Sequence, residues 1–585
     1  MTETTPGREI VQLVEVVQPL CGNVYGATPC TASGPAAERC YNTRATCQDG
    51  SNYALGDPLR LFFSRGHVAE QGIDGAAYII PSLVSVSTSP TRINLAGANP
   101  DAQGLGNRAL CTITLADHQH TDRLVDPYLD GRTWDPLDRE RGSFWSRWLV
   151  RNRYRQNIIV KVYEGYAGQT LAQMTVRQYF LQSIAGPSNG RVTLKAKDVL
   201  AKIEERKAQA PIASPGELYA AIDASQTSIE VAGALVSEYA ASGTLRIGDE
   251  LMTYSAVTTS ANGITFTITD RGSDGTTAAE HDAEASVQQC LRYTNKLFYT
   301  ILQDLLETYG GIDSAYLDTA GWQSEIDDFL LAYRLSALIT EPTSVAQLVS
   351  ELQEQSLVYV WWDERDALVK IKTIRGIEAE PPVVSDSANI IAGSVSFQEM
   401  PRQRASQVWV WYGRDNFVRA VNDVKSYASL IVDADLESEG PEQYGEKSIR
   451  KIFARWLSTG ALAETTASKI IRRYVDVPSQ IKFRLDAKDR AYWIGDVVAI
   501  SHYLDVDAYG ARRVRYWTIT SAEEVVPGEI IEYHAEDTTL YGRIHYVMAT
   551  GAPDYPGYDN APFRNCYVGD AAGLLSDGQD AGRIS

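Results

Sequence analysis

Four cysteines stand close together near the start of the chain, at Cys21, Cys30, Cys40 and Cys47, and they are more than half of its seven cysteines. Cysteine thiolates bind soft metals or pair in disulfides, so a dense group in a cysteine-poor chain indicates one common chemical cause. The candidates are two disulfides, a tetrahedral zinc site and an iron–sulfur cluster.

The spacing of these cysteines narrows the choice. Successive cysteines are separated by eight, nine and six residues. Zinc sites usually begin with two cysteines about two to four residues apart, because a tight turn aims both thiolates at one ion, so zinc is the weaker metal interpretation. The chain opens with Met-Thr-Glu-Thr-Thr-Pro, without the basic start and apolar run of a signal peptide, which predicts synthesis in a reducing compartment and disfavours disulfides.

The residues around the cysteines also disfavour plain buried thiols. Gly, Pro, Ser, Thr and Asn surround all four, whereas structural cysteine usually lies among aliphatic side chains. Residue chemistry alone therefore favours a metal centre over free thiols. The other three cysteines, Cys111, Cys290 and Cys566, are expected to be unpaired thiols outside this site.

Composition excludes several classes of protein. A chain of 585 residues is expected to hold several domains, because single cores stop growing near ~250–300 residues. The formal charge of −20 argues against a surface that binds DNA or RNA stably, since phosphate contacts need clustered Lys and Arg. No apolar stretch approaches the ~20 residues of a membrane helix. The 11 Trp and 32 Tyr, against 12 Phe, suit half-buried positions at subunit contacts.

The pattern of β-prone runs predicts a mainly β, multidomain fold with α+β elements. A first large β domain is expected over 56–210, with a helix over 198–209. Between its strands, residues 126–155 interleave arginines with aromatic residues, and in so acidic a chain this favours Arg–aromatic stacking within or between subunits. The expected strands of this domain lie at 83–88, 110–115, 158–163, 179–184 and 192–197.

Two smaller units follow the linker that begins at Pro211. Short strands divided by Gly, Asn and Ser predict a small β-barrel over 211–290, in which the Gly-rich run after Arg271 is a turn and His281 is structural. Residues 291–375 are expected to form an α+β domain. Its predicted elements are helices over 295–309, 322–335 and 344–355, and a strand pair over 357–372.

Strands return in the last part of the chain. A second large β domain is predicted over 376–540, followed by a C-terminal tail at 541–585 that lacks a core pattern. This domain is expected to contain strands at 407–412, 479–485, 496–501 and 516–526 around a helix over 461–474.

The sequence holds no recognisable catalytic motif. It has no nucleophile elbow, zinc-protease helix or phosphate-binding loop, and its seven histidines are scattered. His118 and His120 alternate beside Asp117 and Asp122, but this is a weaker metal hypothesis than a polar strand end. The chain is therefore not expected to be an enzyme.

The order of these parts resembles the tail hub proteins of long-tailed bacteriophages and gene transfer agents. The similar segments are Arg141-Gly-Ser-Phe-Trp-Ser-Arg-Trp, Gly243-Thr-Leu-Arg-Ile-Gly-Asp-Glu-Leu-Met-Thr-Tyr, Trp361-Trp-Asp-Glu, and the run Thr518-Ile-Thr-Ser-Ala-Glu-Glu-Val-Val-Pro-Gly. The resemblance implies a virion protein, assembled in the host cytoplasm, whose two tube-like β domains make a homotrimer behave as a pseudo-hexameric ring. Such a ring closes the distal end of the tail tube and forms part of the channel for DNA ejection. The partners it implies are the distal tail protein ring, the C-terminus of the tape measure protein, and tail fibre or spike proteins.

The cysteine group has a resemblance of its own. Cys21, Tyr25 and Cys30, followed by Cys40 and Cys47, are similar to the cluster-binding segment of lambda-like tail tip protein L. That family implies a 4Fe-4S cluster held by the four cysteines, so 1–55 is expected to be an N-terminal iron–sulfur segment. Zinc is the alternative metal. In lambda-like proteins this segment lies at a C-terminus, whereas here it leads the chain.

Two other classes of function remain open. An iron–sulfur redox protein predicts a second cofactor site, and the sequence has no flavin or nicotinamide loop. A surface adhesin linked by disulfides predicts oxidised cysteines.

Overall fold

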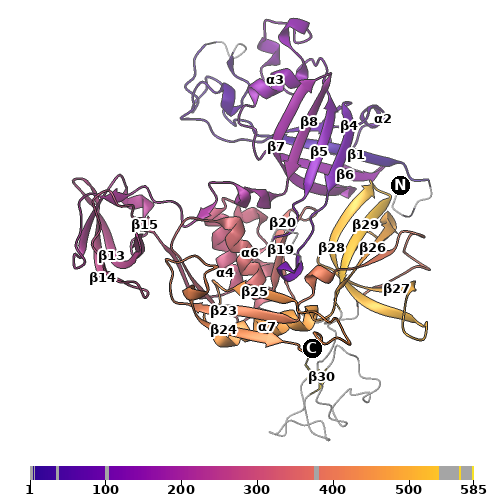
Figure 1. The fold of residues 1–585 in the computed structure, drawn as a ribbon. Coiled ribbons are helices and arrows are strands. Elements are labelled where there is room, and N and C mark those ends of the chain that lie inside the picture. The colour runs from indigo at the N-terminus through magenta and orange to yellow at the C-terminus, as the bar shows by residue number, and fades with distance from the viewer. Residues whose placement is uncertain are drawn as a thin grey trace.

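The computed structural model describes residues 4, 7–34, 39–98, 105–374 and 381–538, together with two short strands, β30 (Cys566–Tyr567) and β31 (Arg583–Ile584). Figure 1 shows two large β units on one side of the molecule, a central region of helices and short sheets, and a small β unit that projects on the other side. The predicted tail at 541–585 lies outside the described residues, except for these two strands. None of the described helices has the length and apolar character needed to cross a membrane.

The first large unit is an eight-stranded sheet with the order β3-β2-β1-β6-β7-β8-β5-β4. Buried residues alternate along β5 and β8, as in β5, where Cys111, Ile113 and Leu115 are fully buried. Its strands are β1 (Ile10–Gln18), β2 (Leu59–Phe63), β3 (Ile79–Ile80), β4 (Leu83–Ser89), β5 (Leu110–Ala116), β6 (Ile159–Tyr166), β7 (Thr175–Ser188) and β8 (Arg191–Lys197).

Strand β1 belongs to the first large sheet and not to a separate N-terminal segment. Residues 10–18 fall within the predicted iron–sulfur segment, 1–55, but they form β1, which lies inside the sheet, antiparallel to both β2 and β6. Val14 and Val16 of β1 are fully buried in the core of this unit. The cysteines therefore lie in an excursion between two neighbouring strands, residues 19–58, which we call the cysteine segment.

The small unit is a closed six-stranded sheet with the order β10-β11-β14-β13-β12-β15. Leu218 in β10 donates its N–H to Ala285, just before β15, so the first and last strands meet and close the barrel. Its six strands lie within 211–290, the range over which the sequence predicts a small β-barrel. The strands are β10 (Glu217–Leu218), β11 (Ser228–Ala232), β12 (Gly243–Ile247), β13 (Glu250–Ser260), β14 (Gly263–Asp270) and β15 (Gln288–Gln289).

The central region shares one large core. Its helices are α4 (Phe298–Asp304), continued by a π-helical turn (Leu305–Tyr309), α5 (Thr319–Phe329), α6 (Val345–Ser356) and α7 (Gly460–Tyr474). Its strands are β9 (Gln209–Ala210), β16 (Leu291–Lys296), β17 (Leu335–Ile339), β18 (Thr343–Ser344), β19 (Val358–Asp363), β20 (Leu368–Thr373), β23 (Gln407–Arg414), β24 (Tyr427–Ala434) and β25 (Ile449–Phe453).

Two predicted helices differ from the structure. The helix expected over 198–209 is only a short 3₁₀ helix, Val199–Glu204. The helix expected over 322–335 ends at Phe329, and Leu335 starts β17. Leu335 is fully buried beside the helices, so its apolar side chain serves a core strand, although its spacing also fits a helix face.

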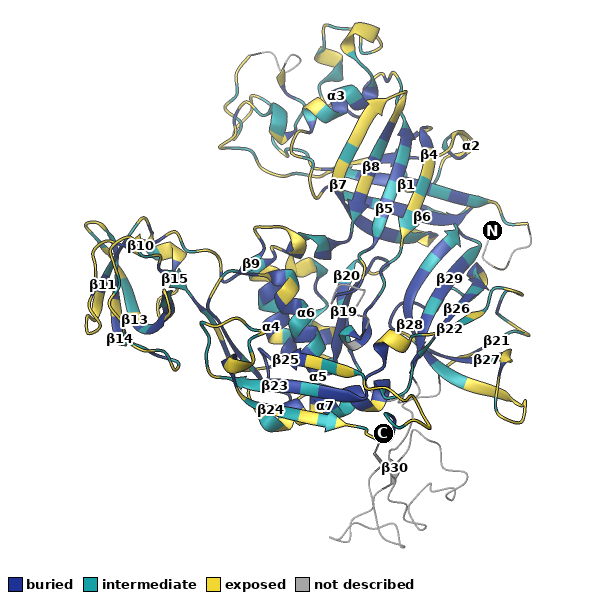
Figure 2. Ribbon diagram, viewed as in Figure 1, coloured by how far each residue is buried: buried dark blue, intermediate teal, exposed yellow. Residues whose placement is uncertain are grey.

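The second large unit is a six-stranded sheet with the order β21-β27-β28-β29-β26-β22. Residues 400–478 lie between β22 and β26 in the chain, and the sequence predicts them in the same domain as those strands. They form β23 to β25 and α7 and pack in the central core instead. Figure 2 shows buried residues along the centres of both large sheets, whereas the far half of β7 and the outer end of β27 are exposed. The strands are β21 (Val383–Ser385), β22 (Ser396–Glu399), β26 (Ser479–Asp486), β27 (Val497–Val506), β28 (Arg512–Val526) and β29 (Ile530–Asp537).

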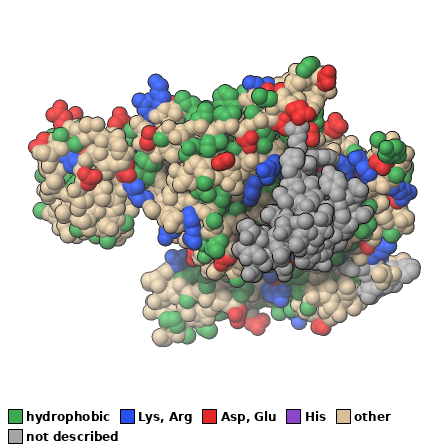
Figure 3. Space-filling view, turned by 90° about the horizontal axis from the view of Figure 1, so that it is seen from below, with side chains coloured by type: hydrophobic (Ala, Val, Ile, Leu, Met, Phe, Trp, Pro, Cys, Tyr) green, Lys and Arg blue, Asp and Glu red, His purple; other side chains and the backbone are tan. Residues whose placement is uncertain are grey.

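The surface carries mixed charge. On the face shown in Figure 3, Lys and Arg side chains are scattered among acidic and apolar ones and do not gather into one basic patch.

Candidate metal centre

The two ends of the cysteine segment are pinned together at the sheet. Cys21 and Leu55 form an isolated antiparallel β-bridge, and Gly22 donates its N–H to the carbonyl of Ala54 over 2.9 Å. A Cβ on Gly56 would collide with the backbone of Gly22, so the close approach of the two ends requires glycine. The chain therefore leaves the sheet after β1 and returns to it before β2 at nearly the same place.

No apolar core holds the cysteine segment. None of the residues 19–58 that the structure describes belongs to a hydrophobic cluster of the molecule. Below ~40 residues, domains usually need disulfides, metals or oligomerisation to fold. The segment must therefore be stabilised by polar contacts, by docking on the rest of the chain, or by a bound group.

Asp49 is the polar centre of the segment. Its carboxylate accepts hydrogen bonds from the N–H and hydroxyl of Thr31 at 2.7 and 2.9 Å, and from Ser51 and Asn52 at 3.1 and 3.0 Å. The bond from the Thr31 N–H, together with the side-chain bonds, lowers the pKa of Asp49 well below its usual range. Thr31 follows Cys30 and Asp49 lies just after Cys47, so this carboxylate ties the two cysteine pairs together.

The cysteine segment docks on α3 (Phe144–Arg151) and the loop before it. Ser143 caps α3 by accepting the N–H of Ser146, and Trp145 and Trp148 are buried in the core beneath. The hydroxyl of Thr43 donates to the carbonyl of Arg151 over 2.5 Å. On the loop, the Tyr128 hydroxyl accepts the N–H of Tyr25 and donates to Asn42, both over 3.0 Å.

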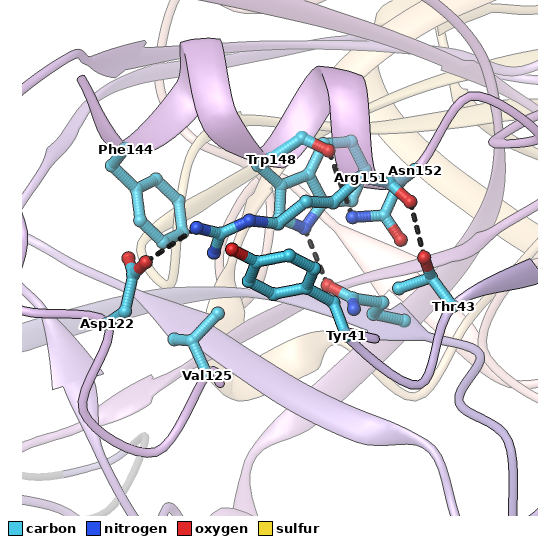
Figure 4. A pocket seen from close by; sticks show the side chains of 9 residues that line it. Tyr41, Thr43, Asp122, Val125, Phe144, Trp148, Arg151 and Asn152 are labelled. Atoms are coloured by element: carbon cyan, nitrogen blue, oxygen red, sulfur yellow. Dashed lines mark hydrogen bonds and ion pairs between the residues drawn. The ribbon is translucent and has the colours of Figure 1, made fainter. Parts of the chain in front are cut away.

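Tyr41 is the main side-chain contact of this docking. The guanidinium carbons of Arg132 and Arg151 lie 3.8 and 4.0 Å from the centre of its ring. Each arginine is also paired with an aspartate, Arg132 with Asp126 at 2.7 Å and Arg151 with Asp122 at 2.8 Å. Figure 4 shows Arg151 reaching from α3 across Tyr41 to Asp122. The predicted Arg–aromatic stacking is thus confirmed within the chain.

The seam between the segment and α3 leaves little room for a ligand. Its cavity, lined among others by Thr43, Trp148 and Asn152, has a volume of about 10 Å³. That is about the space of one water molecule. We conclude that this seam is a packed interface.

The four thiols of the segment act on one another electrostatically. Cys40 is buried, and the other three are partly exposed. Burial raises the pKa of Cys40, and the neighbouring Cys47, Cys30 and Cys21 raise it further. A thiol whose ionisation is disfavoured by burial and by three neighbouring thiols is one whose thiolate a bound cation would stabilise.

The geometry of the thiols is looser than that of a metal site. Within the described residues, no three His, Cys, Asp or Glu side chains are grouped so that they could hold a metal ion. None of the six described cysteines forms a disulfide. Iron–sulfur clusters are usually held by four cysteine thiolates, so the four cysteines fit such a cluster in kind and number. The structure does not place their four sulfurs in coordinating positions.

The other described cysteines are chemically different. Cys111 in β5 and Cys290 before β16 are buried, and burial raises the pKa of each to about 12. Such thiols stay protonated and do not bind metals at neutral pH. This agrees with their expected place outside the site, whereas the side chain of Cys566 lies outside the described residues.

The two alternating histidines have structural contacts. His118 stacks on Phe144 with 5.7 Å between ring centres, and Nδ1 of buried His120 accepts the N–H of Asp122 over 2.9 Å. Both follow the end of β5 and do not lie on the strand. They therefore support the loop that carries Asp122, as the polar-strand-end interpretation expects.

Comparison with known proteins gives remote matches only. No family model matches the chain, and no curated protein does. Among solved structures, the prophage tail protein gp18 from Listeria monocytogenes EGD-e has 9% identity over 78% of this chain and 88% of its own, with a TM-score of 0.34. The 43 kDa tail protein of prophage MuSo2 from Shewanella oneidensis has 10% identity over 78% of this chain and 98% of its own, also with a TM-score of 0.34.

A chain from the virion of a native gene transfer agent particle has 11% identity over 59% of this chain and 94% of its own, with a TM-score of 0.30. All three descriptions are of tail or virion proteins, the class that the sequence resemblance indicates, and none is of an enzyme. At these TM-scores the likeness does not establish a function for this chain.

Proposed function

We propose that the chain is a structural virion protein, the hub of a phage-type tail, in which three copies form a ring that closes the distal end of the tail tube. The proposal combines the sequence resemblance, which covers most of residues 60–540, with one feature of the fold. Each chain contributes two large and mainly antiparallel sheets, of eight and six strands, that lie next to each other on one side of the central region. Three chains with two β units each would present six β units around the ring, which matches the sixfold symmetry of a tail tube.

This hub would be located at the tail tip, after assembly in the host cytoplasm. Its neighbours would be the distal tail protein ring on one side and the tape measure C-terminus and tail fibre or spike proteins on the other. The lumen of the ring would form part of the channel for DNA ejection. A net charge of −20 would keep passing DNA from binding to its walls.

The hub proposal is tested by the size and shape of the purified full-length chain. Light scattering should give three times the chain mass of 64.4 kDa, and electron microscopy should show rings with apparent sixfold features. Gold-labelled antibody should bind at the tail tip of assembled particles. A monomer at high concentration, together with no label on the tails, would overturn the proposal.

We further propose that Cys21, Cys30, Cys40 and Cys47 hold a 4Fe-4S cluster that cross-links the cysteine segment. The observation that carries this proposal is the combination of four free thiols, three of which raise the pKa of the fourth, with a segment whose described residues belong to no apolar core. The cluster would supply four covalent links between parts of the segment, and its role would be structural. Arg132 would fix the backbone at one ligand, because its Nη2 donates to the carbonyl of Cys40 over 2.7 Å.

Anaerobic purification tests the cluster directly. Brown protein with a broad visible absorption, about four iron and four sulfide per chain, would support it. Colourless protein with stoichiometric zinc would replace iron with the alternative metal. Protein made in reducing cytosol that carries no metal, and whose thiols are oxidised in pairs, would favour the adhesin, whereas a reversible redox change linked to substrate turnover would favour the redox protein.

A further inference from the structure

Asn42 lies between the two cysteine pairs and contacts a cysteine of each. Its carbonyl accepts the N–H of Cys21 over 2.6 Å, and its own N–H donates to Sγ of Cys40 over 3.4 Å. Both contacts use the backbone of Asn42, so any movement of this residue is passed to two of the four cysteines.

The backbone of Asn42 adopts the left-handed conformation, with a φ of 53°. Asparagine enters this region at a lower cost than most residues, because its short polar side chain can form local hydrogen bonds. The turn that results directs the N–H of Asn42 back to the sulfur two residues earlier in the chain. The residue type at this position is therefore part of what places Cys40.

The side chain of Asn42 joins the cysteines to the rest of the molecule. Its Oδ1 accepts the hydroxyl of Tyr128 over 3.0 Å and the thiol of Cys40 over 3.4 Å. Tyr128 lies outside the cysteine segment, on the loop between β5 and α3. The same hydroxyl accepts the N–H of Tyr25, whose ring makes an edge contact with Tyr128 at 6.4 Å. One phenol therefore meets both halves of the cysteine segment.

The loop that carries Tyr128 is itself held in place. Asp126 accepts the N–H of Tyr128 over 3.0 Å and pairs with Arg132 over 2.7 Å, and both members of this ion pair are buried. Nη2 of Arg132 also donates to the carbonyl of Cys40 over 2.7 Å. The loop thus reaches Cys40 by two routes, through Arg132 to its carbonyl and through Tyr128 and Asn42 to its sulfur.

We infer, on the basis of the proposed cluster, that Asn42 and Tyr128 are positioning residues of the cysteine centre, and that they couple the binding of the cluster to the docking of the segment. Docking places Cys40 and Cys21, so a docked segment binds the group more tightly than an undocked one. Coupling of this kind is reciprocal, so loss of the group weakens the docking by the same factor.

The contact with the sulfur separates this role from docking alone. When Cys40 becomes a metal ligand, its proton leaves to solvent and the bond from its thiol to Oδ1 is given up. The N–H of Asn42 remains as a donor, now to a thiolate, and such charge-assisted bonds are stronger than neutral ones. Hydrogen bonds to the sulfurs of a cluster raise its reduction potential, because they stabilise the more negative reduced state. A contact that served docking alone would not change this potential.

The test measures iron release to a ferrous chelator from the anaerobically purified full-length chain. Tyr128→Phe and Asn42→Gly both remove the bond to Oδ1, and glycine keeps the left-handed backbone with its N–H. Each variant should release iron about tenfold faster or more, as is typical when the residues behind a metal ligand are changed, and its midpoint potential should become more negative. Tyr154→Phe, at an exposed tyrosine after α3, is the matched control and should behave like the unmodified chain.

The double variant and the reverse experiment complete the test. Tyr128→Phe combined with Asn42→Gly should release iron no faster than either single variant, because both changes break one link. Removing the iron from the unmodified chain should speed hydrogen exchange in peptides from 39–49 and from 126–132. If Asn42→Gly does not fold, Tyr128→Phe, which removes one hydroxyl, carries the same comparison.

The outcomes distinguish this inference from the cluster proposal. An unmodified chain that binds iron, with variants that release it at the same rate, would overturn the inference and leave the cluster in place. Faster release that is additive in the double variant, with an unchanged potential, would show that the contact serves docking alone, and would also overturn the inference. An unmodified chain without iron would overturn the cluster proposal and the inference together.

Discussion

The cysteine segment and the small barrel are both excursions from larger units, but they are stabilised in opposite ways. The barrel buries its own core, in which Phe266 is fully buried and its ring makes edge contacts with Tyr239 and Tyr254 at 5.0 and 4.9 Å. The cysteine segment contributes no described residue to any hydrophobic cluster. Its order rests on Asp49, on its docking to α3 and, in our proposal, on a cluster.

The difference shows how chain closure substitutes for cross-links. Six short strands that close on themselves satisfy their backbone groups and bury alternate side chains, so about eighty residues suffice for a core. About forty residues of loop cannot do this, because their polar side chains exclude little apolar surface from water. A different kind of substitution should therefore unfold each of the two excursions.

The largest effect is expected from removing a cluster ligand. Cys40→Ser should abolish iron binding, open the cysteine segment to proteases and stop tail assembly, because one missing ligand breaks the cross-link. Iron content, limited proteolysis and particle counts measure this. Cys30→Ser should act in the same way, whereas Cys111→Ala should lower thermal stability but keep the iron. Infectious tails with normal iron from Cys40→Ser would remove the proposed role.

A core substitution should affect the barrel alone. Phe266→Ala leaves a cavity between Tyr239 and Tyr254 and should cost about 3–5 kcal/mol of barrel stability. Hydrogen exchange should then show fast exchange in β11 to β14 with normal protection in β1 and β6. Thr267→Ala, at the next and exposed position of β14, is the matched control and should change little. Loss of order in the cysteine segment as well would show that the two excursions are coupled.

Asp49 should matter to the cysteine segment but not to the barrel. Asp49→Asn weakens the bonds from Thr31, Ser51 and Asn52, so the segment should become more sensitive to proteases at neutral pH. Because the pKa of Asp49 is lowered, its stabilisation is present above the ordinary value of 3.8 and is lost as the pH falls below it. In the unmodified chain, protease sensitivity of the segment should therefore rise in acid, and a flat profile would contradict this.

The smallest effect is expected at the docking contact. Tyr41→Leu removes the ring that lies against Arg132 and Arg151 and should cost about 1 kcal/mol of docking free energy. A double-mutant cycle with Arg132→Met, read out by chemical denaturation of the segment, measures the coupling. Tyr41→Phe keeps the ring and should remain close to the unmodified chain. No coupling in the cycle would mean that the docking depends on the hydrogen bonds of Thr43 and Tyr128 and not on the ring of Tyr41.

Several strands could be predicted because their alternation is local. The runs that form β5, β8 and β14 each place apolar residues on one face, and the structure buries those faces. Errors arose where one pattern fits two structures, as at Leu335. Strand β1 was missed because its partners, β2 and β6, are far along the chain, so only the sheet order shows that 10–18 belong to the core.

The sequence by itself determined the four-thiol donor set, its polar surroundings, the β-rich composition and the acidic charge. These depend on residue types and short spacings, which fold cannot change. Only the tertiary structure decided that Tyr41 meets Arg132 and Arg151, and that the Tyr166 hydroxyl donates to the carbonyl of Gly528 across the two large sheets. Such contacts join residues distant in the chain, and burial, which raises the pKa of Cys40, is a property of the packed molecule.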